Sequence, residues 1–380
     1  MYDKKHRALP QTDRMNVMTQ NFSVPVEQFN LRGNVVLVEP YGCGHINRTF
    51  RVVTDTDNWY LFQRVNTDIF PNIEGLMDNI QLVTRHIREK IKPESTDPDR
   101  ECMVIVHTKD GEPFARLDDG CWRCFVFIRD TVTLQAVNQP KDFYLSAVAF
   151  GRFQQQLQDF DASQLCEVIP NFHNTPWRLQ NLLQAEQADT MDRVKEVQKE
   201  LDFVHERAGF CHLLQDAIED GSLPLKVTHN DTKLNNLLFD EKTMQPICVV
   251  DLDTVMPGSA LFDFGDSIRF GAATAAEDEK DLSKVECSLE LFEAYVKGWM
   301  ESCGDSMTEK EISLLPAAAR MMTLECGIRF LTDYLQGDTY FATHYYGQNL
   351  DRCRTQFKLV ADMEKKEAQM HAIVEKYAHG

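Results

Sequence analysis

The fourteen residues VTHNDTKLNNLLFD, positions 227–240, contain the most informative pattern in this sequence. They hold one histidine, two aspartates, one lysine and three asparagines, and these polar residues lie between short apolar segments such as Leu237–Phe239. Such crowding is typical of a loop that a rigid core holds in place. Carboxylate and amide oxygens accept protons and bind hard cations. The segment therefore predicts a chemical site.

Asp231 and Asn236 have the spacing D-x-x-x-x-N, which is found in phosphoryl-transfer catalytic loops. The aspartate can accept the proton of an attacking hydroxyl, and the asparagine can fold back to offer its side-chain oxygen to Mg²⁺. The apolar segment CVVDLD, positions 248–253, is expected to be a strand whose carboxylate, Asp251, holds the same metal. The alternative for Asp231 and Asn236 is capping of a helix or turn. The spacing of Asp231, Asn236 and Asp251 along the chain, taken together, favours phosphoryl transfer.

Two further features of this region are expected to be structural. His229 is expected to hold the loop through bonds to backbone groups. The triplet Asp263-Phe264-Gly265 spells a magnesium-binding motif, but no strand is expected to lead into it at the right distance from Asn236. The metal is therefore assigned to Asp251, and Asp263 and Asp266 are expected to be anchors.

Composition excludes several classes of protein. The chain has 380 residues, of which 43% are hydrophobic and 26% charged, and a formal net charge of −19. A generic nucleic-acid binder needs a basic surface, so this class is not expected. No apolar run is long enough for a membrane span, and the odd number of cysteines, eleven, fits free thiols in a reducing cytoplasm. No obligate protein partner is evident.

The pattern along the chain predicts an α+β protein with a small β-rich lobe and a large, mainly helical lobe. We expect a disordered leader over 1–20, an N-terminal lobe over 21–130 that covers the nucleotide, and a catalytic and sugar-binding lobe over 131–380. The first lobe should contain one helix, 73–91. Its expected strands, from alternation and turn signals, are 34–41, 48–54, 59–65, 103–108, 114–117 and 121–128.

Several motifs together resemble the aminoglycoside phosphotransferase and choline kinase family. They are EPYGCGHIN, NTDIFPN, FDASQL, HNDTKLNN, VVDLDTVMPGSALFDFGDSIRFG and LECGIRFLTDYLQGDTYFAT. The likeness covers roughly residues 20–370 and is closer to kinases that act on the C1 hydroxyl of N-acetylhexosamines. It implies a protein-kinase-like bilobal fold, ATP and Mg²⁺ as cofactors, and N-acetylglucosamine or N-acetylgalactosamine as the acceptor.

The resemblance also implies roles for individual residues. Asp231 would be the catalytic base, and Asn236 and Asp251 the Mg²⁺ ligands. The loop with Gly42, Gly44 and Asn47 would cover the phosphates, and adenine would contact the backbone between Phe127 and Arg129. The residues that would line the sugar pocket are His45, Phe270, Arg329 and Tyr340. The alternatives are core packing for Phe270 and Tyr340, and an ion pair with Asp333 at i+4 for Arg329.

One feature departs from the pattern of kinases. The third strand of the first lobe carries Gln63 or Arg64 where kinases have a lysine, and the following helix offers Asn79 in place of its glutamate partner. We hypothesise that Lys233 supplies the missing positive charge to the γ-phosphate.

Two other functions remain open. The same fold serves kinases of aminoglycosides, choline and other small alcohols, but a cationic acceptor needs an acidic pocket, and the expected pocket residues are not acidic. A catalytically inactive kinase that binds a ligand or partner is the second alternative. Only the missing lysine–glutamate pair supports it.

Overall fold

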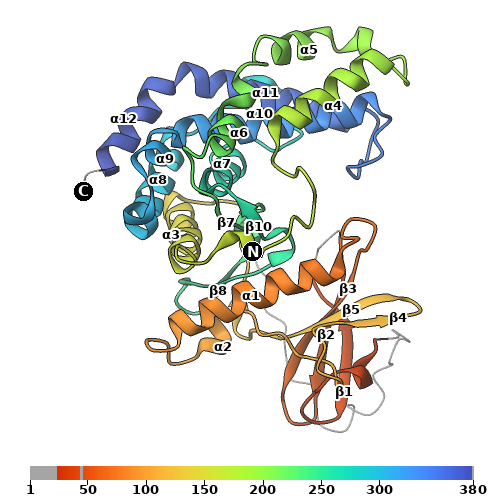
Figure 1. Cartoon of the computed structure of the whole chain (residues 1–380). Coiled ribbons are helices and arrows are strands. Elements are labelled where there is room, and N and C mark those ends of the chain that lie inside the picture. Colours follow the sequence, from red (N-terminus) through yellow and green to blue (C-terminus); the bar gives the residue numbers. More distant parts are fainter. Residues whose placement is uncertain (1–23, 43–45, 379–380) are drawn as a thin grey trace. The chain divides into compact units, whose positions relative to one another are not determined.

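The computed structural model describes residues 24–42 and 46–378 (Figure 1). The expected leader, 1–20, and the residues Gly44 and His45 lie outside the described residues. Contacts divide the chain into two compact units. One contains the chain up to Ile69 together with Val104–Arg129, and the other contains Phe70–Met103 together with Asp130 onwards. Residues 70–103, which we assigned to the N-terminal lobe, thus group with the C-terminal unit.

The first unit is built on an antiparallel sheet of five strands in the order β1-β2-β3-β5-β4. Its strands are β1 Val35–Pro40, β2 Arg48–Thr54, β3 Trp59–Val65, β4 Ala115–Leu117 and β5 Gly120–Val126. Alternate residues, such as Phe50, Phe62 and Trp122, bury one face of the sheet against Phe29. The other face carries polar groups, since Gln63 of β3 lies opposite Arg123 of β5.

The strand expected over 103–108 is not formed as such. Residues 104 and 106 pair through backbone hydrogen bonds with residues 124 and 126 of β5, as an isolated bridge. β4 is paired with residues 120–122, the other end of β5. The segment therefore extends the sheet only briefly beyond the end of β4.

The second unit is mainly helical, and the helix expected over 73–91 is confirmed as α1, Ile73–Ile91. The central helix of this unit is α10, Leu315–Leu335, whose most extensive contacts are with three other helices. These are α4 Thr175–Ala188, α7 Ala260–Gly271 and α11 Gln348–Lys365. The remaining helices are α2 Pro98–Glu101, α3 Pro140–Gln156, α5 Gln198–His205, α6 Leu213–Glu219, α8 Leu289–Cys303, α9 Glu309–Ser313 and α12 Glu367–Ala378. In Figure 1, α10 and α11 are drawn in blue, and α7 packs against α10.

Two small sheets interrupt the helices and frame the region 228–251. β7 Lys226–Thr228 pairs with β10 Met256–Gly258. β8 Leu237–Asp240 forms a hairpin with β9 Pro246–Val249, and β6 Thr131–Val132 pairs with the other edge of β8. Apolar side chains of this region, Leu234, Leu237 and Phe239, are buried in the core of the unit. The polar residues between β7 and β8 therefore rest on a packed apolar base.

Candidate active site

The loop between β7 and β8 is held by hydrogen bonds to the buried helix α7. Asp263 of that helix is fully buried and accepts the backbone N–H groups of His229 and Asn230 at 2.9 and 2.7 Å. Asp266 accepts the N–H of Thr232 at 3.1 Å. Burial raises the pKa of Asp263, and the donated hydrogen bonds counteract this by stabilising the carboxylate. The expectation that both aspartates are anchors is confirmed.

His229 is bonded to backbone groups, as expected. Its Nδ1 accepts the N–H of Asp231 at 3.3 Å, and its Nε2 lies 3.0 Å from the carbonyl oxygen of Val250. Since Val250 offers only an acceptor, the ring proton is on Nε2. The fully buried ring also contacts Phe150 and Phe153 edge-on, so it joins the loop to α3 and to the chain after β9.

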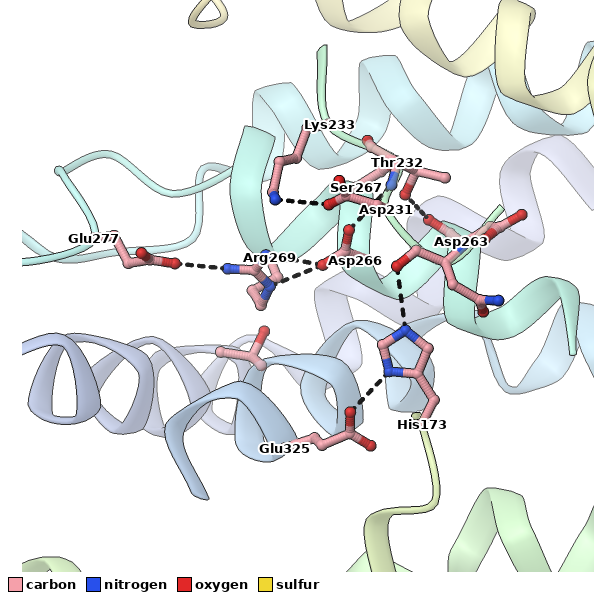
Figure 2. Close-up of polar contacts among 12 residues, drawn as sticks. His173, Asp231, Thr232, Lys233, Asp263, Asp266, Ser267, Arg269, Glu277 and Glu325 are labelled. Atoms are coloured by element: carbon pink, nitrogen blue, oxygen red, sulfur yellow. Dashed lines mark hydrogen bonds and ion pairs between the residues drawn. The ribbon is translucent and has the colours of Figure 1, made fainter. Parts of the chain in front are cut away.

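Asp231, Lys233 and Asn236 are brought into direct contact. The Nζ of Lys233 is 2.6 Å from Oδ1 of Asp231 (Figure 2). Nδ2 of Asn236 donates to the carbonyl oxygen of Asp231 at 2.8 Å and to its Oδ2 at 3.0 Å. The fold-back of the asparagine, inferred from the five-residue spacing, is thus present. Because the amide nitrogen faces Asp231, the amide oxygen of Asn236 is the atom that can accept a cation.

The β8–β9 hairpin brings Asp251 to the same end of the site as Asn236. Asn236 immediately precedes β8, and its carbonyl oxygen accepts the N–H of Val250 at 2.9 Å. Asp251 follows β9 with its backbone in the left-handed region, φ 60°, and it is exposed. An aspartate tolerates this conformation better than most residues. The chain therefore turns away from β9 at Asp251, the residue assigned to the metal.

The charge on Lys233 is supported by two carboxylates. Burial lowers the pKa of Lys233, but Asp231 and Asp266 outweigh this and raise it overall. Asp266 is itself paired with Arg269 at 2.8 Å, and Arg269 reaches Glu277 at 3.0 Å (Figure 2). The loop therefore lies at one end of a row of alternating charges, which fixes Lys233 as a cation beside Asp231.

The residues assigned to the sugar pocket lie in this unit, apart from His45. Arg329 of α10 lies with its guanidinium 6.0 Å from the ring of Tyr340 and 5.2 Å from that of Phe172. Tyr340 is 60% exposed, so its core-packing alternative is wrong. Phe270, at the end of α7, is half-buried.

The alternative partner of Arg329 is also wrong. The carboxylate of Asp333 accepts the backbone N–H groups of residues 339, 340 and 341 and the side-chain amide of Asn349. The Nε of Arg329 is buried without a hydrogen-bond partner in the described part of the chain. Asp333 thus shapes the turn that carries Tyr340, and Arg329 contacts aromatic rings.

The residues assigned to the nucleotide belong to the first unit. Gly42 has φ +78°, which favours glycine, and a Cβ there would meet nothing within 4 Å. Asn47 accepts the N–H of Asn66 at 3.0 Å. The N–H of Phe127 is already bonded to the carbonyl of Trp59, and Arg129 stacks on that tryptophan while pairing with Asp57 at 2.9 Å. The N–H of Phe127 is therefore used within the sheet and not toward adenine.

The structure shows what occupies the position of the usual lysine. Gln63 accepts from Nε and Nη2 of Arg123 at 3.0 and 2.8 Å, and Arg123 is almost fully buried in β5. Asn79 of α1 instead bonds to backbone groups of Cys166 and Val255 within the second unit. Sequence reasoning missed Arg123, although the cross-strand alternation of β3 and β5 was available to find it.

Sequence reasoning also missed a buried pair beside the loop, His173 and Glu325. Nδ1 of His173 is 2.8 Å from the Glu325 carboxylate (Figure 2). Its Nε2 is 3.3 Å from the carbonyl oxygen of Asn230. Their separation of about 150 positions in the chain explains why no local motif reveals them.

No helix among the described residues is long and apolar enough to cross a membrane. The same residues contain no cluster of three or more His, Cys, Asp or Glu side chains that could hold a metal ion. The expected metal site uses one asparagine and one aspartate, so it would not form such a cluster.

Comparison with known proteins now places the chain. The model of the phosphotransferase enzyme family, APH, matches residues 38–284. Among solved structures, an aminoglycoside phosphotransferase from Alicyclobacillus acidocaldarius is 15% identical, with a TM-score of 0.61, over 93% of this chain and 96% of that one. A microcompartment-associated aminopropanol kinase is also 15% identical, with a TM-score of 0.54, over 91% and 96%. A spectinomycin phosphotransferase solved with ADP and spectinomycin is 12% identical, with a TM-score of 0.51, over 88% and 93%. The chain therefore belongs to the phosphotransferase enzyme family and has its two-part kinase-like fold.

Proposed function

We propose that this phosphotransferase transfers the γ-phosphoryl group of ATP to the C1 hydroxyl of an N-acetylhexosamine, N-acetylglucosamine or N-acetylgalactosamine. The observation that carries the proposal is the contact set of Asp231, in which one carboxylate oxygen meets a lysine and the other an asparagine. A carboxylate oriented in this way can receive a proton from an acceptor hydroxyl. The ADP in the spectinomycin phosphotransferase structure supports ATP as the donor.

The proposed reaction is a direct in-line transfer. Asp231 takes the proton of the C1 hydroxyl while the C1 oxygen bonds to the γ-phosphorus and the bond to the β,γ-bridging oxygen breaks, which releases ADP. An anomeric hydroxyl is more acidic than an ordinary alcohol, so a carboxylate is a sufficient base. Lys233 would turn from Asp231 toward the transferred phosphoryl group and balance its charge.

The oxygen donors of Asn236 and Asp251 fit a magnesium ion. Mg²⁺ prefers hard oxygen ligands and is usually held by one or two carboxylates together with substrate phosphates. The amide of Asn236 is oriented by its bonds to Asp231, which directs the amide oxygen to a cation. When bound, the ion would neutralise charge on the phosphates. In the first unit, the Gly42–Asn47 loop would cover these phosphates, and the segment Phe127–Arg129 would adjoin the adenine.

The charges near Arg329 favour a neutral acceptor. Burial and the neighbouring Arg329 lower the pKa of Arg178 to about 10, so two guanidinium groups lie close together. The carboxylate of Glu325, which interacts with both arginines, is already paired with His173. An aminoglycoside or another cationic acceptor would be repelled here, whereas sugar hydroxyls and an acetamido carbonyl can accept hydrogen bonds from arginine.

The test is consumption of ATP with Mg²⁺ over a panel of acceptors, with ³¹P NMR to locate the phosphate. The panel contains N-acetylglucosamine, N-acetylgalactosamine, glucose, galactose, mannose, choline and kanamycin. We expect a C1 phosphate of an N-acetylhexosamine, with kcat reduced at least about 10³-fold in Asp231→Asn. The exposed Asp216→Asn is the matched control. Turnover of choline or kanamycin alone would overturn the acceptor assignment but not the family.

A further inference from the structure

The peptide group between Asn230 and Asp231 is held from both ends by histidines. Its N–H, on Asp231, donates to Nδ1 of His229, while its carbonyl oxygen, on Asn230, lies 3.3 Å from Nε2 of His173. The orientation of this one peptide group sets the direction in which the Asp231 side chain leaves the backbone. Asn230 has φ 65°, a left-handed conformation that costs free energy and persists only where the surroundings fix it.

The other polar groups of Asn230 are bonded to residues outside this clamp. Its N–H donates to Asp263, and its side-chain amide donates to the carbonyl oxygen of Thr254 at 2.8 Å. These bonds hold the N–H and the side-chain amide of Asn230 but not its carbonyl oxygen. The Asn230 carbonyl oxygen is contacted by the side chain of His173, which precedes α4 and is paired with Glu325 of α10.

Both hydrogen-bond partners of the His173 ring are acceptors. Its Nδ1 faces the carboxylate of Glu325 at 2.8 Å, and its Nε2 faces a carbonyl oxygen, so both partners only accept hydrogen bonds. A neutral imidazole can donate from one nitrogen only, whereas an imidazolium donates from both. The second oxygen of Glu325 accepts from Thr175 Oγ1 at 2.7 Å, which leaves the carboxylate fully oriented.

The surroundings of Glu325 stabilise its ionised form. The Glu325 side chain is 1% exposed. Burial raises the pKa of Glu325, but the charges of His173, Arg329 and Arg178 outweigh this and lower it overall. From α7, Asp266 faces His173 as well, although it is already paired with Arg269. The His173 ring also contacts the rings of Phe172 and Phe262.

We propose that His173, held as an imidazolium by Glu325, is a positioning residue that clamps the Asn230 carbonyl and so fixes the orientation of the base Asp231. Its kinetic consequence rests on the proposed function, in which Asp231 receives the acceptor proton. The pair does not touch substrate in this role, so it should affect kcat more than the KM for ATP.

A cavity of about 120 Å³ beside His173 makes the proposal testable by chemical rescue. It is lined by His173, Phe172, Asn230 and Phe262, among others. His173→Ala should enlarge this space and lower kcat about 10²-fold, the cost typical of a misplaced catalytic group. Added imidazole should restore much of the loss by occupying the vacated position. In the control His205→Ala, which removes a half-exposed histidine paired with Glu186, imidazole should change nothing.

A second measurement is independent of any acceptor. In ¹⁵N spectra of the histidine rings at neutral pH, we expect one ring, lost in His173→Gln, with both nitrogens protonated. Glu325→Gln should abolish this signature. A His173 ring protonated on one nitrogen only would overturn the proposal, as would a His173→Ala enzyme within about twofold of wild-type kcat. If wild type phosphorylates no N-acetylhexosamine, the proposed function fails, and the spectra still decide whether the clamp exists.

Discussion

Replacement of Asp263 by asparagine tests whether α7 supports the loop between β7 and β8, which carries the proposed base Asp231. In the wild type, Oδ1 accepts the N–H of Asn230 at 2.7 Å, and Oδ2 accepts the N–H of His229 at 2.9 Å and the amide of Gln154 at 2.7 Å. An asparagine keeps the shape of the side chain but replaces one acceptor by an N–H₂ donor. In either orientation of the new amide, at least one buried backbone N–H therefore faces a donor.

The expected loss of stability follows from these contacts. A buried polar group left unpaired costs about 1–3 kcal/mol, and each hydrogen bond to a charged acceptor contributes about 1.5–3 kcal/mol. Part of this is offset because the neutral amide is easier to bury than a carboxylate, as the raised pKa of Asp263 indicates. We expect a net loss of about 3 kcal/mol, which for a unit of this size lowers Tm by about 5 °C.

Thermal unfolding of Asp263→Asn and of the control Asp216→Asn would measure this loss. Asp216 is 68% exposed in its side chain and only loosely paired with His212, so its replacement should change Tm by less than about 1 °C. Asp263→Asn should also lower phosphoryl transfer, because the backbone of the proposed catalytic loop loses hydrogen bonds that hold it. A variant with unchanged Tm and full activity would refute the assignment of Asp263 as an anchor.

Three further predictions concern other positions. Gly42→Ala should strain the left-handed backbone by about 1–2 kcal/mol and raise the KM for ATP several-fold in steady-state kinetics. The control is Gly347→Ala, where φ is +82° and the surroundings are equally open; it should leave the KM for ATP unchanged. Gln63→Lys restores the residue usual in kinases and places a second cation against the buried Arg123. It should therefore lower the unfolding free energy, measured in a urea titration, by about 2–4 kcal/mol. A variant as stable as wild type would show that Arg123 can turn away. Because the pKa of Glu325 is lowered from 4.5, its ionised form stabilises the fold above that pH, and this contribution is lost as pH falls through the folded pKa. The difference in unfolding free energy between wild type and Glu325→Gln, measured in denaturant titrations, should therefore be largest at neutral pH and should decrease in acid. A difference that does not change with pH would contradict this.

The local features of the site were predictable because they depend on short spacings. The five-residue separation of Asp231 and Asn236 implied a fold-back, and the structure shows the asparagine amide on the Asp231 carboxylate. The helix over 73–91 followed from an apolar stripe with the helical period, and α1 has these bounds. The catalytic and metal-binding roles of these residues stay predictions that the kinetic experiments address.

The contacts that support the loop were not predictable in the same way, because their partners are far apart in the sequence. Glu325 meets His173 only after α10 is packed against α4, and Arg123 meets Gln63 only after β5 pairs with β3. The ion pair expected between Arg329 and Asp333 has ideal helical spacing, yet backbone N–H groups of the following turn bind the carboxylate instead. Spacing along a helix makes such a pair possible, but the nearest competing donor decides whether it forms.

Competition from N–H donors also explains why Asp263, in the triplet Asp263-Phe264-Gly265, is a poor metal ligand and Asp251 a better candidate. The carboxylate of Asp263 is fully buried, and three N–H donors already occupy its oxygens, so a cation would have to break these bonds and displace the loop. Asp251 is exposed at the exit of β9, next to the residue whose N–H ties that strand to Asn236. A hard cation needs carboxylate oxygens at a surface that phosphates can reach. The burial of Asp263 and the hydrogen bonds that it already accepts, rather than its place in the three-residue motif, therefore distinguish this anchor from the candidate ligand Asp251.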